Sequence, residues 1–173
     1  MHTVIRVIVK AKTKDDALGE ARCAFEDLCG EGKSFDYFTM FDEDEPTVSG
    51  KARYGSIPAA LKVSTKAGAK MVREGMEITR REFNEKLAKI REGLAKYTAD
   101  ELFEGESKRF PKDTDLFLFR HNCYGAGQYS GPDIWLYDRF GGGIQSQRML
   151  DSTLDEKLND GEQFWVVPAD VHF

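Results

Sequence analysis

Two short polar runs hold the side chains best suited to chemistry, residues 120–124 (RHNCY) and residues 137–139 (YDR). If both runs end neighbouring strands, a thiol, an imidazole, a carboxylate and two guanidinium groups come close together. A cysteine nucleophile needs a base within hydrogen-bond reach, and His121 is close to Cys123 in the sequence. On a strand, side chains two residues apart are separated by about 6.6 Å, so these two meet only if the loop turns back. We therefore assign no catalytic residues, and whether the chain is an enzyme stays open.

Residues 123–132, called the Tyr/Gly loop here, combine three glycines with two tyrosines. A phosphate-binding loop precedes a helix N-terminus, whereas this loop is expected to precede a strand. Tyrosine and glycine together favour a recognition loop, because they supply contact area and adaptability. The candidate binding residues of this loop and of the two strand ends are Arg120, His121, Tyr124, Gln128, Tyr129, Asp138 and Arg139.

The composition predicts one globular domain spanning residues 1–173. Hydrophobic residues make up 40% and aromatic residues 12%, which is too many for a disordered chain. The net charge of −5 argues against nucleic acid or an anionic membrane as the main partner. No apolar run is long enough for a membrane span or a signal peptide, so we expect a soluble, cytoplasmic protein.

Cysteine and histidine usage gives no sign of a metal or another cofactor. The three cysteines lack C-x-x-C spacing, so neither a disulfide framework nor a zinc site is indicated. His2, His121 and His172 are widely scattered and suggest no metal cluster. We expect no cofactor.

The first part of the chain has the pattern strand, helix, strand. Thr3–Ala11 alternates as a strand does, and Thr13 offers an N-cap to a helix that runs to Cys29 and stops at Gly30. Ser34–Phe41 is expected to be the second strand. Pro58, in Ser-Ile-Pro, is placed to start a short helix.

A long helix over residues 65–97 is the central element. Its apolar residues from Phe83 onward recur in steps of four and three, and form a stripe within roughly 80° of the helix surface. Packing on the protein's own sheet is favoured, but so narrow a stripe also suits docking of a second copy in a homodimer. Gly75 is a point where the helix could break. Thr98 and Glu101 resemble a capping box that opens a further short helix.

The last third is expected to be rich in strands. Pro168 should place the end of the terminal strand at a sheet edge or outside the sheet. The expected elements are strands at 116–122, 134–140, 144–150 and 164–167, with a hairpin at Gly141–Gly143 and a short helix at 152–159.

These elements predict an α+β fold. We expect a mainly antiparallel sheet, with a ferredoxin-like N-terminal half as a further option, and both the long and the N-terminal helix on one face. Our first functional hypothesis is a non-catalytic binding or accessory protein that acts through the Tyr/Gly loop and the adjacent strand ends. Its expected partner is another protein or a second copy. The alternative is a small enzyme or ligand-binding domain for a nucleotide or another anion, using Arg120, His121, Tyr124 and Arg139.

Nucleic-acid binding by the central helix is a second alternative. Residues 66–97 carry nine basic and five acidic side chains. Contacts to phosphates would make the affinity fall steeply with salt. The interspersed glutamates are typical of a solvated helix with i,i+4 pairs, so we do not expect nucleic acid as the main partner.

Overall fold

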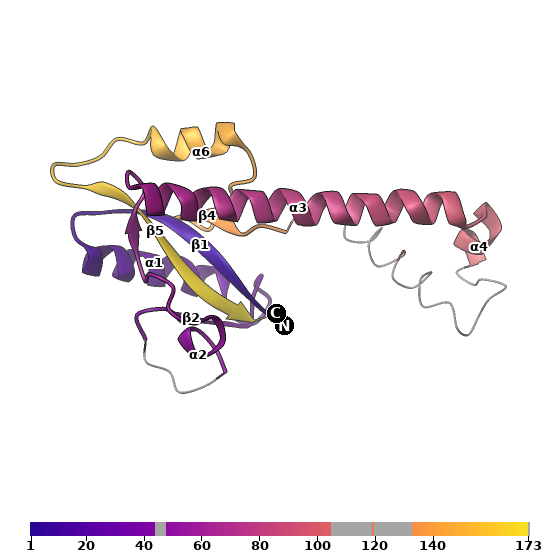
Figure 1. Cartoon of the computed structure of the whole chain (residues 1–173), viewed down its shortest axis with the longest axis horizontal. Helices are drawn as coiled ribbons and strands as arrows, with labels where there is room; N and C mark the ends of the chain where they lie inside the picture. The colour runs from indigo at the N-terminus through magenta and orange to yellow at the C-terminus, as the bar shows by residue number, and fades with distance from the viewer. Residues whose placement is uncertain (44–47, 105–118, 120–132, 173) are drawn as a thin grey trace. The chain divides into compact units, whose positions relative to one another are not determined.

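The computed structural model describes residues 1–43, 48–104, 119 and 133–172, which form two compact units. Unit 1 comprises Met1–Thr79 and Ile134–Phe173, and unit 2 comprises Arg80–Asp133. The elements in chain order are β1 (His2–Ala11), α1 (Lys14–Leu28), β2 (Tyr37–Met40), α2 (Lys51–Tyr54), β3 (Leu61–Lys62), α3 (Lys66–Lys96), α4 (Ala99–Glu104), β4 (Leu136–Asp138), α6 (Gln147–Leu154) and β5 (Gln163–His172) (Figure 1).

A five-stranded sheet forms the centre of unit 1, so the predicted α+β class is confirmed. The strand order is β2-β5-β1-β4, with β3 also paired to β5. Among the paired strands of the described residues, β1 and β4 are parallel and the other pairs are antiparallel. Because β1 and β2 both run antiparallel to β5, they are parallel to each other with β5 between them. This split βαβ unit is the arrangement that a ferredoxin-like half has.

β5 is a central strand, although Pro168 led us to expect an edge or a position outside the sheet. Pro168 lies opposite Arg6 of β1. The Arg6 N–H points away from β5 and donates to the carbonyl of Trp135, the residue just before β4. The Arg6–Pro168 pair is thus a non-hydrogen-bonded one, and Pro168 directs its nitrogen away from β1. On that other side, β2 pairs from Ala169 onward and β3 pairs only to Val166. The missing N–H therefore falls in the gap between two short strands and costs no ladder bond.

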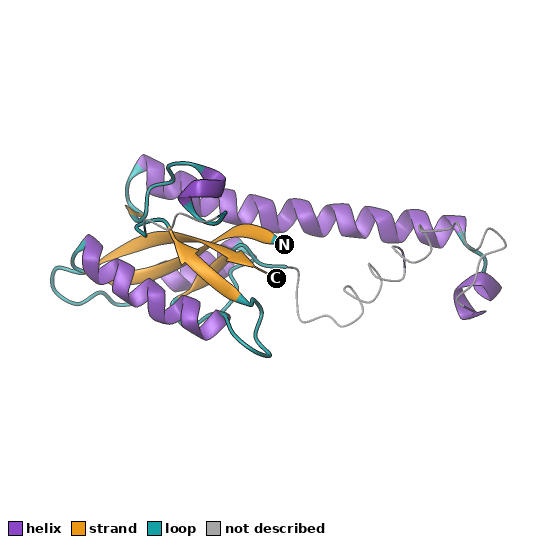
Figure 2. Ribbon diagram, turned by 90° about the horizontal axis from the view of Figure 1, so that it is seen from below, coloured by secondary structure: helices purple, strands orange, loops and turns teal. Residues whose placement is uncertain are grey.

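Helices cover both faces of the sheet, which corrects the expectation of one helical face. Alternate β1 residues (Ile5, Val7, Val9) belong to a buried cluster that includes Phe25 of α1. Ile8, on the opposite face, belongs to a second cluster with side chains from the start of α3 and from α6. Figures 1 and 2 show α1 along one face, and α6 with the start of α3 along the other.

α1 and α4 begin with the caps that the sequence predicts. The Thr13 side chain accepts from the Asp16 N–H, and the Asp16 carboxylate accepts from the Thr13 N–H. Thr98 and Glu101 make the same reciprocal pair before α4. Each pair satisfies two backbone donors that a helix start leaves without an internal partner.

α3 is one unbroken helix, and Gly75 serves its packing. A Cβ at this position would lie 3.1 Å from the Leu136 Cβ and 3.1 Å from the Trp135 carbonyl oxygen. One turn later the Thr79 hydroxyl donates to the Gly75 carbonyl at 3.0 Å and accepts from the Trp135 N–H at 3.1 Å. The glycine thus lets α3 approach β4 closely enough for these bonds.

Three predicted elements, one strand and two short helices, differ from the structure. The Tyr137–Gly143 bridge begins the expected hairpin, but Ser146 caps α6 where the strand over 144–150 was expected. That helix replaces the one predicted at 152–159. The short helix expected to start at Ser56–Pro58 is absent from these described residues, and α2 lies just before them.

Unit 2 holds the rest of α3, together with α4. Its small buried cluster consists of Tyr97 and Phe119, with Ile90 and Leu102 packed against them. A Cβ at Gly93 would overlap the Phe119 ring. Phe119 is helical, so the strand predicted over 116–122 is wrong at this residue, and the rest of that stretch lies outside the described residues.

No helix in the described part of the chain is long and apolar enough to cross a membrane.

Candidate functional site

Most of the predicted site falls outside the residues that the structure describes. This applies to Arg120, His121, Tyr124, Gln128 and Tyr129. Their convergence on a pocket therefore stays a prediction. Asp138 and Arg139 are described, and their contacts follow.

Asp138 organises its own turn. Its Oδ1 accepts from the Phe140 N–H and from the Gly142 N–H, each at 2.8 Å. Gly141 has a φ of +75°, and a Cβ at Gly142 would collide with the Asp138 carboxylate. These contacts explain why the carboxylate and the glycines occur together, without any ligand.

Arg139 engages a different part of unit 1. Its guanidinium carbon lies 4.4 Å from the centre of the Phe140 ring, and its Nη2 lies 3.7 Å from the Glu156 carboxylate. Lys10 shares that carboxylate at 2.7 Å. Nε of Arg139 is buried without a hydrogen-bond partner. Arg139 is thus directed to Glu156, whereas Asp138 is directed to its own turn.

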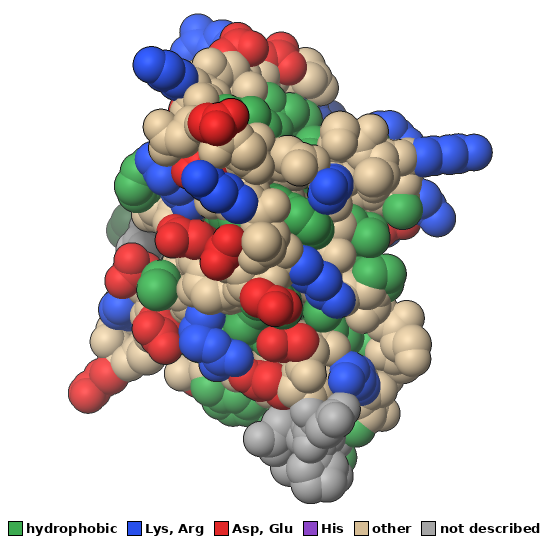
Figure 3. Space-filling view, turned by 90° about the vertical axis from the view of Figure 1, so that its left-hand side faces the viewer, with side chains coloured by type: hydrophobic (Ala, Val, Ile, Leu, Met, Phe, Trp, Pro, Cys, Tyr) green, Lys and Arg blue, Asp and Glu red, His purple; other side chains and the backbone are tan. Residues whose placement is uncertain are grey.

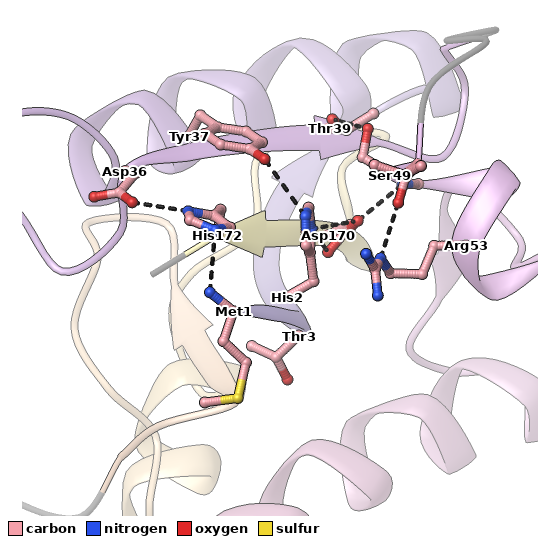
Figure 4. A network of polar contacts seen from close by, with 12 residues as sticks. Met1, His2, Thr3, Asp36, Tyr37, Thr39, Ser49, Arg53, Asp170 and His172 are labelled. Carbon is pink, nitrogen blue, oxygen red and sulfur yellow. Dashed lines mark hydrogen bonds and ion pairs between the residues drawn. The ribbon is translucent and has the colours of Figure 1, made fainter.

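A different polar cluster lies where both ends of the chain meet the edge strand. We define the terminal cluster as His2, Asp36, Tyr37, Asp170 and His172 (Figure 4). The register pairs His2 with His172 across β1 and β5, and pairs Tyr37 with the same histidine across β2 and β5. Cross-strand partners share a sheet face, so these three side chains form one row. Asp170 is two residues before His172 and lies on the same face.

Asp170 is the buried anchor of the terminal cluster, with an exposed fraction of 1%. Both carboxylate oxygens lie 3.2 Å from Nδ1 of His2, and Oδ2 also accepts from the Gly50 N–H at 2.9 Å. Gly50 has a φ of +53°, in the left-handed region that favours glycine. A buried carboxylate needs such partners, because leaving it unpaired would cost about 3–5 kcal/mol of stability.

The loop before α2 is held against the cluster by further polar contacts. The Thr39 hydroxyl donates to the Ser49 hydroxyl at 3.1 Å. Nε of Arg53 donates to the Val48 carbonyl at 2.8 Å. Burial, with a smaller contribution from the negative charge of Asp170, raises the pKa of the Tyr54 hydroxyl. The Gly50 N–H bond to Asp170 therefore joins this loop to the carboxylate that also holds His2.

Three rings form the exposed part of the terminal cluster. The Tyr37 ring stacks on His172, with centroids 5.0 Å apart and an interplanar angle of 8°. The His2 ring is steeply inclined to both, at 76° to Tyr37 with centroids 5.9 Å apart and at 69° to His172 with centroids 5.1 Å apart. The Tyr37 hydroxyl lies 3.4 Å from Nε2 of His2. Even so, 46% of Tyr37 remains exposed.

His172 has partners at both ring nitrogens. Nδ1 lies 2.8 Å from the Asp36 carboxylate, and Nε2 lies 3.1 Å from the Met1 amine. Both histidines are thus oriented by a carboxylate at Nδ1. This pairing resembles the outer partners of metal-bound histidines, but no group of three metal-ligating side chains occurs in the described residues.

Sequence reasoning missed this cluster because its members are far apart in the chain. In the sequence, His2 and His172 stand 170 positions apart and suggest no common site. The only signal was indirect: pairing the first strand with the last in antiparallel register brings the two ends together. The sequence predicted both strands but not their register.

The basic residues of α3 have acidic neighbours. Ion pairs join Lys70 to Glu74 and Arg81 to Glu82 and Glu85. On the face drawn in Figure 3, acidic and basic side chains intermingle without a field of one sign. These pairs fit a solvated helix, and nucleic-acid binding stays a prediction.

Comparison with known proteins places the chain in a family. No curated protein and no solved structure matches it. One family model matches residues 1–173, and its description is a domain of unknown function, DUF7995. The chain therefore belongs to the DUF7995 family.

Proposed function

We propose that this protein is a non-catalytic binding protein that recognises another protein through the terminal cluster. The observation that supports this proposal is the Tyr37 ring, which is half exposed and yet held by His2 and His172. Fixed tyrosines are typical anchors of protein interfaces, because they offer a large contact area and lose little conformational entropy on binding.

The carboxylates of the cluster also fit a binding role. Asp170 holds His2 and the Gly50 N–H, and Asp36 holds His172. In these positions they orient the rings before a partner arrives. A preorganised surface binds more tightly than a flexible one, because less freedom is lost on association.

Site-specific photo-crosslinking tests this proposal. A benzoylphenylalanine at position 37 should give a discrete covalent adduct in an extract of the cells that produce the protein. The same probe at Phe140, which is 71% exposed in another part of unit 1, should not give that adduct. Excess wild-type protein should suppress the adduct, and excess Tyr37→Ala protein should not.

Each result of the crosslinking experiment has a clear reading. An adduct with a different protein supports the proposal, and an adduct with the mass of two chains identifies the partner as a second copy. Absence of an adduct at position 37, or equal labelling from position 140, contradicts it.

A small enzyme is the second candidate, because Asp170, His2 and Tyr37 form a chain from carboxylate to imidazole to hydroxyl. A buried carboxylate that orients an imidazole toward a hydroxyl is an arrangement used in acid–base catalysis. A thermal-shift screen with nucleotides and other anions tests this candidate. Stabilisation that is lost in His2→Asn would favour it, and stabilisation lost only in Arg120→Ala would return the site to the Tyr/Gly loop.

A further inference from the structure

The hydrogen bonds of the terminal cluster have definite directions when both histidines are neutral. An ionised carboxylate only accepts, so His2 must donate to Asp170 from Nδ1. In a neutral imidazole the other nitrogen is then an acceptor. Nε2 of His2 therefore accepts from the Tyr37 hydroxyl, 3.4 Å away. The proton of Tyr37 is used inside the protein, and its lone pairs are left for a ligand.

The same reasoning gives the hydrogen-bond directions at His172. His172 donates from Nδ1 to Asp36, and its Nε2 accepts from the Met1 amine. Asp36 keeps further acceptor capacity, because its side chain is 66% exposed and a carboxylate has about four lone-pair sites. The imidazoles have thus used their donors on carboxylates.

On the side of His172 that carries Asp36 and Tyr37, the exposed surface consequently offers acceptors and an aromatic face, whereas the Met1 ammonium lies at the other ring nitrogen, Nε2. The acceptors are the Tyr37 oxygen and the Asp36 carboxylate, and the face is the side of the Tyr37 ring that does not stack on His172. A cation that carries several N–H donors suits both features. Arg53 directs its Nε to the Val48 carbonyl, and it lies on the other side of Asp170 from Tyr37 (Figure 4).

We propose that the terminal cluster binds the ammonium or guanidinium group of a lysine or arginine side chain of the partner protein. This inference rests on the proposed function and names the chemistry of the partner. A negatively charged group would meet the Tyr37 oxygen and the Asp36 carboxylate without a donor from either.

A titration of the full chain with simple ions tests the inference. n-Butylammonium and methylguanidinium chloride are added at constant ionic strength, and sodium butyrate serves as the anion of matched size. NMR signals of the Tyr37 ring and of the His2 and His172 rings report binding. Saturable shifts with both cations and none with butyrate are expected. Equal or stronger shifts with butyrate overturn the inference.

Four variants assign the binding to the named groups. Asp36→Asn and Tyr37→Leu should each weaken cation binding by at least about twofold. Asp27→Asn removes an equal charge from an exposed position on α1 and should leave binding unchanged. Arg53→Gln should strengthen cation binding, whereas it would weaken binding of an anion. Unchanged affinity in Asp36→Asn and Tyr37→Leu, with spectra that show folded protein, overturns the inference.

The two experiments fail independently. A specific crosslink from position 37 without any cation binding leaves the proposed function standing and removes the inference about charge. Loss of the crosslink at position 37 removes the proposed function itself, whatever the ions do.

Discussion

Asp170 is a carboxylate that is both buried and fully hydrogen-bonded. A buried carboxylate is costly, and one that is fully hydrogen-bonded is tolerated because its partners replace water. Here the partners are the His2 imidazole and the Gly50 N–H, which come from opposite ends of the chain's first third. The residue therefore ties the start of β1 and the loop before α2 to β5.

Replacing Asp170 should accordingly lower stability more than replacing an exposed aspartate. Asp170→Ala leaves the Gly50 N–H buried without a partner and frees His2, so we expect a loss of about 2–4 kcal/mol in the free energy of unfolding. Asp27→Ala, on the exposed side of α1, should change it by no more than about 0.5 kcal/mol. Urea unfolding followed by circular dichroism measures both. Equal effects would contradict the anchoring role.

Cys29 is the described thiol with an altered acidity. Desolvation raises the pKa of Cys29 to about 11, from an ordinary value of 9.0. At pH 8 the thiolate, which is the reactive form, is then about a hundredfold scarcer than in an unshifted thiol. Iodoacetamide should modify Cys29 far more slowly than the exposed Cys23, and the rate at Cys29 should keep rising with pH until about pH 11.

Peptide mapping by mass spectrometry separates the two cysteines and measures both rates. Faster modification of Cys29 than of Cys23 at pH 8, or a Cys29 rate that levels off below pH 9, would show that burial does not hold the thiol neutral. Unfolding in urea should abolish the difference, because it removes the desolvation.

At the scale of single elements, replacing a helical glycine by alanine should change the stability in opposite directions in α1 and in α3. Helix propensity alone favours alanine over glycine by about 1 kcal/mol. Gly19, in α1, has nothing within 4 Å of a Cβ, so Gly19→Ala should stabilise the protein by about that amount.

Gly75→Ala in α3 should be destabilising instead. The Trp135 carbonyl that faces the new methyl group also accepts from Arg6, so it cannot move away without weakening the sheet. We expect a net loss of about 1–3 kcal/mol, which is typical of overpacking. Thermal unfolding of both variants tests the pair, and stabilisation by Gly75→Ala would show that α3 shifts freely over β4.

Elements were predictable from the sequence where local chemistry decides them. Thr13 and Thr98 mark helix starts through caps that need only neighbouring residues, and the steps of the stripe in α3 need only one helix. Prediction failed where a distant partner decides. Pro168 is tolerated in β5 only because β2 and β3 leave a gap beside it, and that gap follows from three separate strands.

The candidate site shows the same limit. Nothing near His2 in the sequence points to His172 or Asp170, because the cluster exists only through the register of β1, β2 and β5. Conversely, the sequence around Asp138 suggests a binding residue, because the carboxylate is followed by an arginine and three glycines. Its carboxylate instead closes the turn to Gly142.

At the scale of the whole molecule, the division into two units bears on whether the chain is one cooperative domain. Every strand of the sheet, α1, α6 and the terminal cluster belong to unit 1. Unit 2 enters and leaves unit 1 at residues 79 and 134. These positions are close together, because the Thr79 hydroxyl accepts from the Trp135 N–H at 3.1 Å.

Excision of residues 80–133 should therefore leave a folded unit 1. A Gly/Ser linker of about four residues is long enough to join residues 79 and 134. The shortened protein should keep a dispersed NMR spectrum, a cooperative unfolding transition and the cation-induced shifts of the Tyr37 ring, because the sheet and its two buried clusters are retained. The full chain, measured in parallel, is the control.

A collapsed, non-cooperative fragment would mean that the two units fold only together, as expected of a single domain over residues 1–173. Since the excised segment includes the Tyr/Gly loop, retained crosslinking from position 37 in the fragment would place recognition in unit 1 alone.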